Sequence, residues 1–137
     1  VVDYGCGSGI LGIAAWLLGA RHVWMVDNDP QALTATEANA ERNAIRPGDL
    51  YPAHPDELPP LAADLLLANI LASPLLELAE SFAERVKPNG RLVLAGLLHS
   101  QAERIMQGYA PWFAFETPRL DEEDPTWALL VGRRWPA

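Results

Sequence analysis

The chain has 137 residues, of which half are apolar and a fifth are charged, the balance of an ordinary soluble globular domain. Its net charge of -8 and its lack of a basic stripe disfavour direct nucleic-acid binding; they suit a small cationic ligand or a basic protein partner, or reflect solubility alone. No apolar run approaches the ~20 residues of a membrane helix, and the single cysteine, Cys6, excludes an intrachain disulfide and favours a reducing cytoplasm.

The start of the chain predicts a strand, a tight glycine loop and a helix, in that order. Two valines lead into Asp3, glycine then recurs at positions 5, 7 and 9, and an apolar segment follows at residues 10–18. Such a loop lets a ligand lie against bare backbone at a helix N-terminus. Because the chain begins inside the strand, we expect that a preceding segment is missing.

The remaining elements alternate between strands and helices. The predicted strands are 23–26, 50–53, 64–68, 91–95, 112–117 and 126–131, and the predicted helices are 30–42, 73–86 and 100–108. Strands separated by helices indicate a mainly parallel sheet. The last two strands have only an acidic loop, 121–125, between them, so we expect them to pair antiparallel.

Local signals set several of these boundaries. Gly19 is placed to end the first helix, and Asp29-Pro30 is typical of an N-cap followed by proline at the first helical position. Ser100 and Glu103 have the spacing of a capping box. The segment 87–90, Lys-Pro-Asn-Gly, predicts a turn.

The glycine spacing disfavours a dinucleotide-binding loop. Gly5 and Gly7 fit the G-x-G-x-x-G fingerprint, but its third position falls on Ile10, and Gly9 stands one residue early. The acid at Asp3 is also not part of that fingerprint. A pyrophosphate cradle, and with it a dehydrogenase, is therefore a poor interpretation.

Two polar residues follow predicted strands at the edge where ligands bind in such sheets. Asp27 ends the second strand, where a carboxylate can accept hydrogen bonds from both hydroxyls of a ribose. The alternative role of helix cap suits Asp29 better. Asn69 ends the strand 64–68, and its amide both donates and accepts hydrogen bonds, although an asparagine that merely begins a turn is the alternative.

The glycine loop, Asp27 and Asn69 together resemble class I S-adenosylmethionine-dependent methyltransferases. The segments 2–11, 27–30, 39–43 and 68–72 look like the ribosomal protein L-eleven methyltransferase family (PrmA type), and the segments 96–98 and 127–133 are similar too. The stretch Asn69-Ile70-Leu71-Ala72 is the most specific, because methyltransferases of amide nitrogens and DNA adenine usually carry Asn/Asp-Pro-Pro-aromatic there.

The resemblance implies an α/β fold: a Rossmann-like, doubly wound, mainly parallel seven-stranded sheet with an antiparallel C-terminal strand pair and helices on both faces. Residues 1–137 would form one S-adenosylmethionine-binding methyltransferase domain, truncated at its N-terminus. The substrate-docking domain that this family carries before it is expected to be absent from the chain.

The resemblance also assigns the site. The predicted cofactor-binding residues are Asp3, Gly5, Gly7, Gly9, Asp27 and Asn69, and Asn69 is the predicted catalytic residue. The loop would lie under the methionyl part of the cofactor, Asp27 would hold the ribose, and Asn69 would line the pocket between the cofactor and the target amine. Asp56 or Glu57 would contact adenine, and no metal is expected.

The implied activity is methyl transfer from S-adenosylmethionine to a lysine side chain or α-amine of a large-subunit ribosomal protein in the cytoplasm, with S-adenosylhomocysteine as product. The alternatives are a nucleic-acid base or small molecule as substrate, or a non-catalytic S-adenosylmethionine-binding fragment. Trp16, Trp24 and Trp127 are interpreted as core packing rather than as a cage for a methylated amine.

Overall fold

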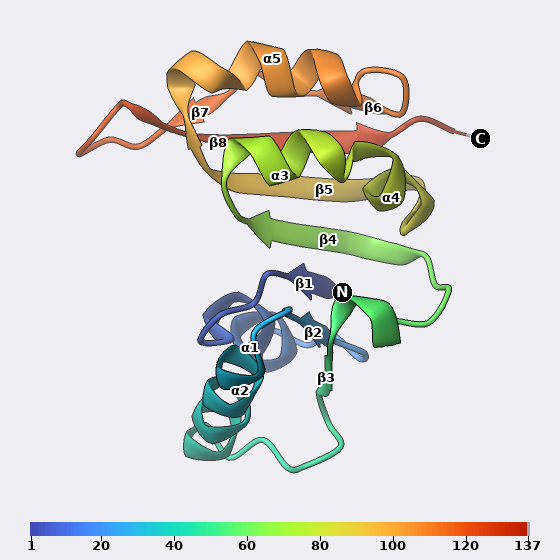
Figure 1. The fold of residues 1–137 in the computed structure, drawn as a ribbon, viewed down its shortest axis with the longest axis vertical. Helices are drawn as coiled ribbons and strands as arrows, with labels where there is room; N and C mark the ends of the chain where they lie inside the picture. Colours follow the sequence, from blue (N-terminus) through green and yellow to red (C-terminus); the bar gives the residue numbers. More distant parts are fainter. Residues whose placement is uncertain (137) are drawn as a thin grey trace. The chain divides into compact units, whose positions relative to one another are not determined.

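The computed structural model describes residues 1–136 and divides into two compact units, Val1–Pro60 and Leu61–Ala137. Each unit combines strands with helices, so the predicted α/β class is confirmed (Figure 1). Among the described residues, no helix is both long enough and apolar enough to cross a membrane.

The first unit is a parallel sheet with crossover helices. Its elements are β1 (Val2–Tyr4), α1 (Ile10–Leu17), β2 (Trp24–Val26), α2 (Pro30–Arg42), β3 (Tyr51–Ala53) and a single 3₁₀ turn, η1 (Pro55–Glu57). The last residues of the three strands are level, because Tyr4 lies opposite Val26 and Val26 lies opposite Ala53. The segments that follow the strands therefore leave the sheet at one edge.

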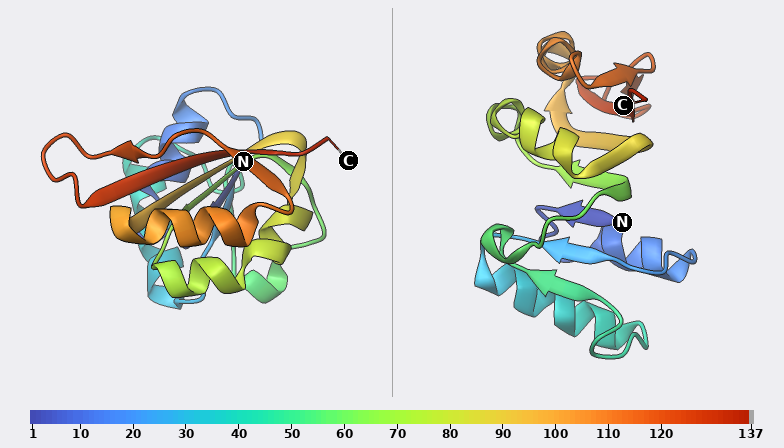
Figure 2. Two further views of the ribbon diagram at one scale, coloured as in Figure 1. Left: turned by 90° about the horizontal axis from the view of Figure 1, so that it is seen from above. Right: turned by 90° about the vertical axis from the view of Figure 1, so that its right-hand side faces the viewer.

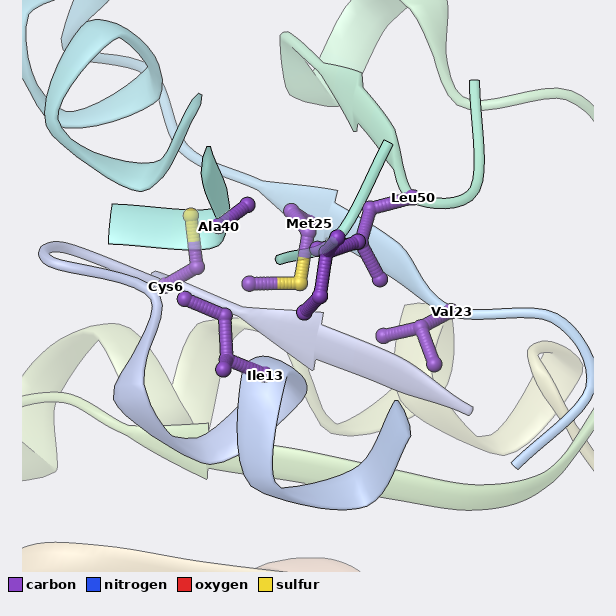
Figure 3. Close-up of a cluster of buried hydrophobic side chains, with 7 residues drawn as sticks. Cys6, Ile13, Val23, Met25, Ala40 and Leu50 are labelled. Atoms are coloured by element: carbon purple, nitrogen blue, oxygen red, sulfur yellow. The ribbon is translucent and has the colours of Figure 1, made fainter. Parts of the chain in front are cut away.

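The predicted boundaries of this unit are confirmed to within a residue or two, and their signals have the expected geometry. Asp29 caps α2 by accepting the Gln31 N–H, and Gly19 takes a positive φ of 108° just after α1. Met25 lies in the middle of the buried cluster between the sheet and the helices, as Figure 3 shows. The members of this cluster are Cys6, Ile13, Val23, Met25, Ala40, Ile45 and Leu50.

The second unit is a mixed sheet. Its elements are β4 (Ala63–Asn69), α3 (Ala72–Glu77), α4 (Ala79–Glu84), β5 (Val86–Leu98), α5 (His99–Tyr109), β6 (Phe113–Phe115), β7 (Arg119–Leu120) and β8 (Trp127–Arg134). β4 pairs parallel with β5, whereas β8 pairs antiparallel with β5, β6 and β7. The expected antiparallel C-terminal strands are thus confirmed, and α3 and α5 lie on one face of these strands (Figure 2).

β5 contains two irregularities. Near its start, Ala63 pairs with Val86 and Leu65 pairs with Arg91, so the residues 87–90 bulge outward. The predicted turn therefore lies inside the strand, with Asn89 at φ 65°. Near its end, Leu94 pairs with Leu130 and Leu97 with Ala128, so two residues of β5 face one residue of β8. This second bulge contains Gly96 at φ 79°.

Three predictions for the second unit need correction. The helix predicted at 73–86 is divided at Leu78, whose ψ of 0° ends α3 and begins α4. The helix predicted from Ser100 begins at His99, and Gln101 Oε1 closes its first turn by accepting the Leu98 N–H. The described residues form eight strands rather than seven, because β7, only two residues long, pairs beside β8.

Candidate functional site

The loop between β1 and α1 is built on glycines in the left-handed region. Gly5, Gly7 and Gly9 have φ values of 76°, 54° and 87°, which other residues rarely adopt. The N–H groups of Gly5 and Cys6 both donate to the Val26 carbonyl, at 2.7 and 2.9 Å, and so fix the loop to the end of β2. A side chain at Gly7 would project into open space, so the backbone there is accessible to a ligand.

Asp27 is fixed beside this loop. Its Oδ2 accepts the Gly7 N–H at 3.0 Å, and its Oδ1 accepts the Asp29 N–H at 3.0 Å. The side chain is half-buried, and a carboxylate offers about four acceptor positions, of which these bonds use two. Asp27 is therefore oriented and still has the capacity to accept two hydroxyl groups.

Asp3 supports the loop from within the core. The N–H of Gly12, in the first turn of α1, has no partner inside the helix and donates to Asp3 Oδ2 at 2.9 Å. The Asp3 side chain is buried, and burial raises its pKa to about 6; the Gly12 bond opposes this shift and the nearby Asp27 charge adds to it. Direct contact of Asp3 with a ligand stays a prediction.

Replacing Asp3 by asparagine is expected to remove a pH dependence of stability. Between pH 3.8 and about 6 the folded state holds a proton that the unfolded state has released, so the free energy of unfolding falls as pH rises. The loss is about 3 kcal/mol and is complete above pH 6. Chemical denaturation at pH 4.5 and 7 should show this fall in the wild type and not in Asp3→Asn, which still accepts the Gly12 N–H.

The exposed Asp56 provides the control for that comparison, because Asp56→Asn removes a surface carboxylate from the same unit. Asp56→Asn should keep the wild-type fall in stability between the two pH values. The same fall in Asp3→Asn would contradict the assignment of the pH dependence to Asp3.

Two residues of α2 also hold the loop and were missed by sequence reasoning. Thr36 is buried, and its hydroxyl donates to the Gly7 carbonyl at 3.0 Å and lies 3.5 Å from Cys6 Sγ. Asn39 Nδ2 donates to the Ser8 carbonyl at 2.8 Å. Their i, i+3 spacing places both on one helix face, which was the available signal. Burial raises the pKa of Cys6 to about 11, so the thiol stays protonated and acts as packing, as predicted.

The segment after β3 holds the two residues predicted near adenine. Asp56 and Glu57 lie on η1, at the same edge as Asp27, whose N–H donates to the Ala53 carbonyl at 3.2 Å. Glu57 Oε1 accepts the His54 N–H at 3.1 Å, whereas the Asp56 side chain is exposed. Which of the two contacts a ligand stays a prediction.

Asn69 lies in the second unit, apart from the residues that the first unit brings together. It is exposed at the carboxyl end of β4, beside the bulge of β5. A side chain at Gly96 would approach Asn69 Oδ1 to 2.6 Å and the Ile70 carbonyl oxygen to 2.9 Å. Gly96 therefore makes room for the Asn69 amide, a role that its sequence position alone did not indicate.

Comparisons with known proteins agree on one family. The model of the family described as ribosomal protein L11 methyltransferase (PrmA) matches residues 1–135. Proteins named ribosomal protein L11 methyltransferase are 52% identical over 134 residues in Marinobacter nauticus and 55% identical over 133 residues in Cellvibrio japonicus. These alignments cover 98% and 96% of the chain, which spans 44% of the length of either relative.

Solved structures give the same result. The ribosomal protein L11 methylase of Lactobacillus delbrueckii subsp. bulgaricus superposes with a TM-score of 0.88 at 31% identity, covering 98% of this chain and 69% of that one. A methyltransferase from Pyrococcus furiosus superposes with a TM-score of 0.82 at 12% identity, covering 98% of this chain and 74% of that one. At that identity the second likeness shows the fold alone.

Proposed function

Given that this chain belongs to the ribosomal protein L11 methyltransferase (PrmA) family, we propose that it binds S-adenosylmethionine and takes part in methyl transfer to an amine of a ribosomal protein. The observation that carries the proposal is the pairing of Asp27 Oδ2 with the Gly7 N–H at 3.0 Å. It joins a ribose-binding carboxylate to a glycine loop with exposed backbone.

The residues of the first unit fit this methyl donor. The open space at Gly7 leaves room for the donor to lie on the loop, and Asp27 has free acceptor positions for two ribose hydroxyls. Asp27 is an acid near the loop, so it also suits a ligand that carries a positive sulfonium. When S-adenosylmethionine is bound, an amine nitrogen forms a bond to its methyl carbon while the C–S bond breaks and the electron pair stays on sulfur, giving S-adenosylhomocysteine.

The chain's own contribution is to hold and orient the amine. Attack requires the neutral amine, and deprotonating lysine near neutral pH costs between about 4 and 5 kcal/mol, whereas an α-amine with a pKa near 8 costs far less. In the proposed reaction Asn69 Oδ1 accepts a hydrogen bond from the amine, and the proton passes to water. Positioning then supplies most of the rate gain.

A ribosomal protein is the proposed substrate because the relatives carry that name. The chain's net charge of -8 is complementary to a basic protein and repels naked nucleic acid. Ribosomes are assembled in the cytoplasm, which is therefore the proposed site of action.

The test is a methylation assay with the natural full-length protein, labelled S-adenosylmethionine and ribosomal protein L11 of the same organism. Label in the ribosomal protein supports the proposal. Label only in RNA would favour the alternative substrate, and binding of S-adenosylmethionine without transfer to any ribosomal protein would favour a non-catalytic module.

Replacing Asn69 by alanine is expected to lower turnover by one to two orders of magnitude and to change cofactor affinity little. The variant loses the acceptor that orients the amine, but Asp27 and the glycine loop keep their hydrogen bonds. Steady-state kinetics and titration calorimetry measure the two quantities separately. A large loss of cofactor affinity with unchanged turnover would refute this role for Asn69.

A further inference from the structure

A cavity of about 560 Å³ opens beside Asn69 in the second unit. Its walls come from the bulge of β5, from β7 and from the start of β8, and they include Asn69, Gly96, Arg119, Asp121 and Trp127. This volume is in the range of pockets that hold small ligands or single side chains. The bulge contributes directly, because it removes one β5 residue from its regular pairing next to Asn69.

Trp127 forms an exposed aromatic wall of this cavity, contrary to the prediction that it packs in the core. It is the first residue of β8, and 45% of its surface is accessible. Its partner across the pair is Leu98, which is itself 37% exposed, so nothing in the described unit covers this end of the strands. An exposed tryptophan at a cavity can pack on an alkyl chain and attract a cation with its ring face.

The charges at the cavity also suit a cation. Asp121 Oδ1 accepts the N–H groups of Glu123 and Asp124, at 2.8 and 3.0 Å, which fixes the carboxylate while its Oδ2 takes no part in these two bonds. The competing positive charge is Arg119, whose Nη2 lies 3.5 Å from Glu116 Oε1 and is thereby partly neutralised.

We propose that this cavity receives the lysine side chain of the target protein, with Trp127 packing on its alkyl stem and Asp121 attracting its ammonium group before the amine reaches Asn69. The inference rests on the proposed methyltransferase function and extends it to the recognition of the target. Trp127 and Asp121 are then specificity residues, which act on the target and not on the methyl donor.

The test measures KM and kcat for ribosomal protein L11, and the Kd for S-adenosylmethionine, in the natural full-length protein. Trp127→Ala should raise KM at least tenfold with an unchanged cofactor Kd, Trp127→Phe should retain most of the affinity, and Trp127→Leu should lie between them. Asp121→Asn should raise KM several-fold, and more at low salt than at high salt.

Matched controls lie in the same unit. Trp135 is 46% exposed at the other end of β8, and Glu122 is an exposed acid in the same loop as Asp121. Trp135→Ala and Glu122→Gln should behave as the wild type. If the wild type methylates its target and Trp127→Ala matches Trp135→Ala, the inference is overturned. A wild type without methylation would instead overturn the proposed function.

Discussion

Asp27→Ala is expected to weaken the binding of S-adenosylmethionine at least a hundredfold. Two hydroxyl groups of the ribose would lose a charged acceptor, and each such hydrogen bond contributes about 1.5–3 kcal/mol. The variant also releases the Gly7 N–H, which loosens the loop on which the donor lies. At about 1.4 kcal/mol for each factor of ten, these losses exceed two orders of magnitude in Kd. Titration calorimetry measures the effect directly.

Asp29→Ala is the matched control, because it removes a neighbouring carboxylate from the same turn. Its side chain caps α2 by accepting the Gln31 N–H, so the variant should lose about 1 kcal/mol of stability. Its backbone N–H still donates to Asp27 Oδ1, and cofactor affinity should stay near the wild-type value. Equal losses of affinity in the two variants would show that general charge, and not the position of Asp27, governs binding.

The first unit could be predicted well because its signals are local. The glycine spacing, the capping Asp29 and the continuous apolar strands each determine structure within a few residues of themselves. The hydrogen bond from Thr36 to the Gly7 carbonyl spans 29 positions. Nothing in either local sequence distinguishes it, since a buried threonine on a helix packs equally well without such a partner.

The second unit departed from prediction where pairing between strands decides the outcome. The turn at 87–90 is absorbed into β5, because β4 continues to pair on both sides of it. Trp127 reads as a core residue in an apolar strand, but it lies at the open end of β8 and lines a cavity. Gly96 appears in sequence as one more glycine, and only the register between β5 and β8 reveals the bulge.

Gly96→Ala is the sharpest test of the second unit, and we expect it to lower kcat about a hundredfold. The new methyl group would lie 2.6 Å from Asn69 Oδ1 and 2.9 Å from the Ile70 carbonyl oxygen, so the amide must move and the rigid backbone blocks the simplest relief. A misplacement of about 1 Å can cost a hundredfold in rate. Cofactor affinity should change little, since Gly7 and Asp27 are untouched.

Gly19→Ala separates this effect from backbone strain alone. Gly19 has a φ of 108°, but a side chain there would meet no atom within 4 Å. Both alanine variants should therefore lose about 1–2 kcal/mol of stability from the left-handed backbone, whereas only Gly96→Ala should lose turnover. If Gly96→Ala keeps its kcat and only matches Gly19→Ala in thermal unfolding, then the space that Gly96 leaves for Asn69 has no part in catalysis.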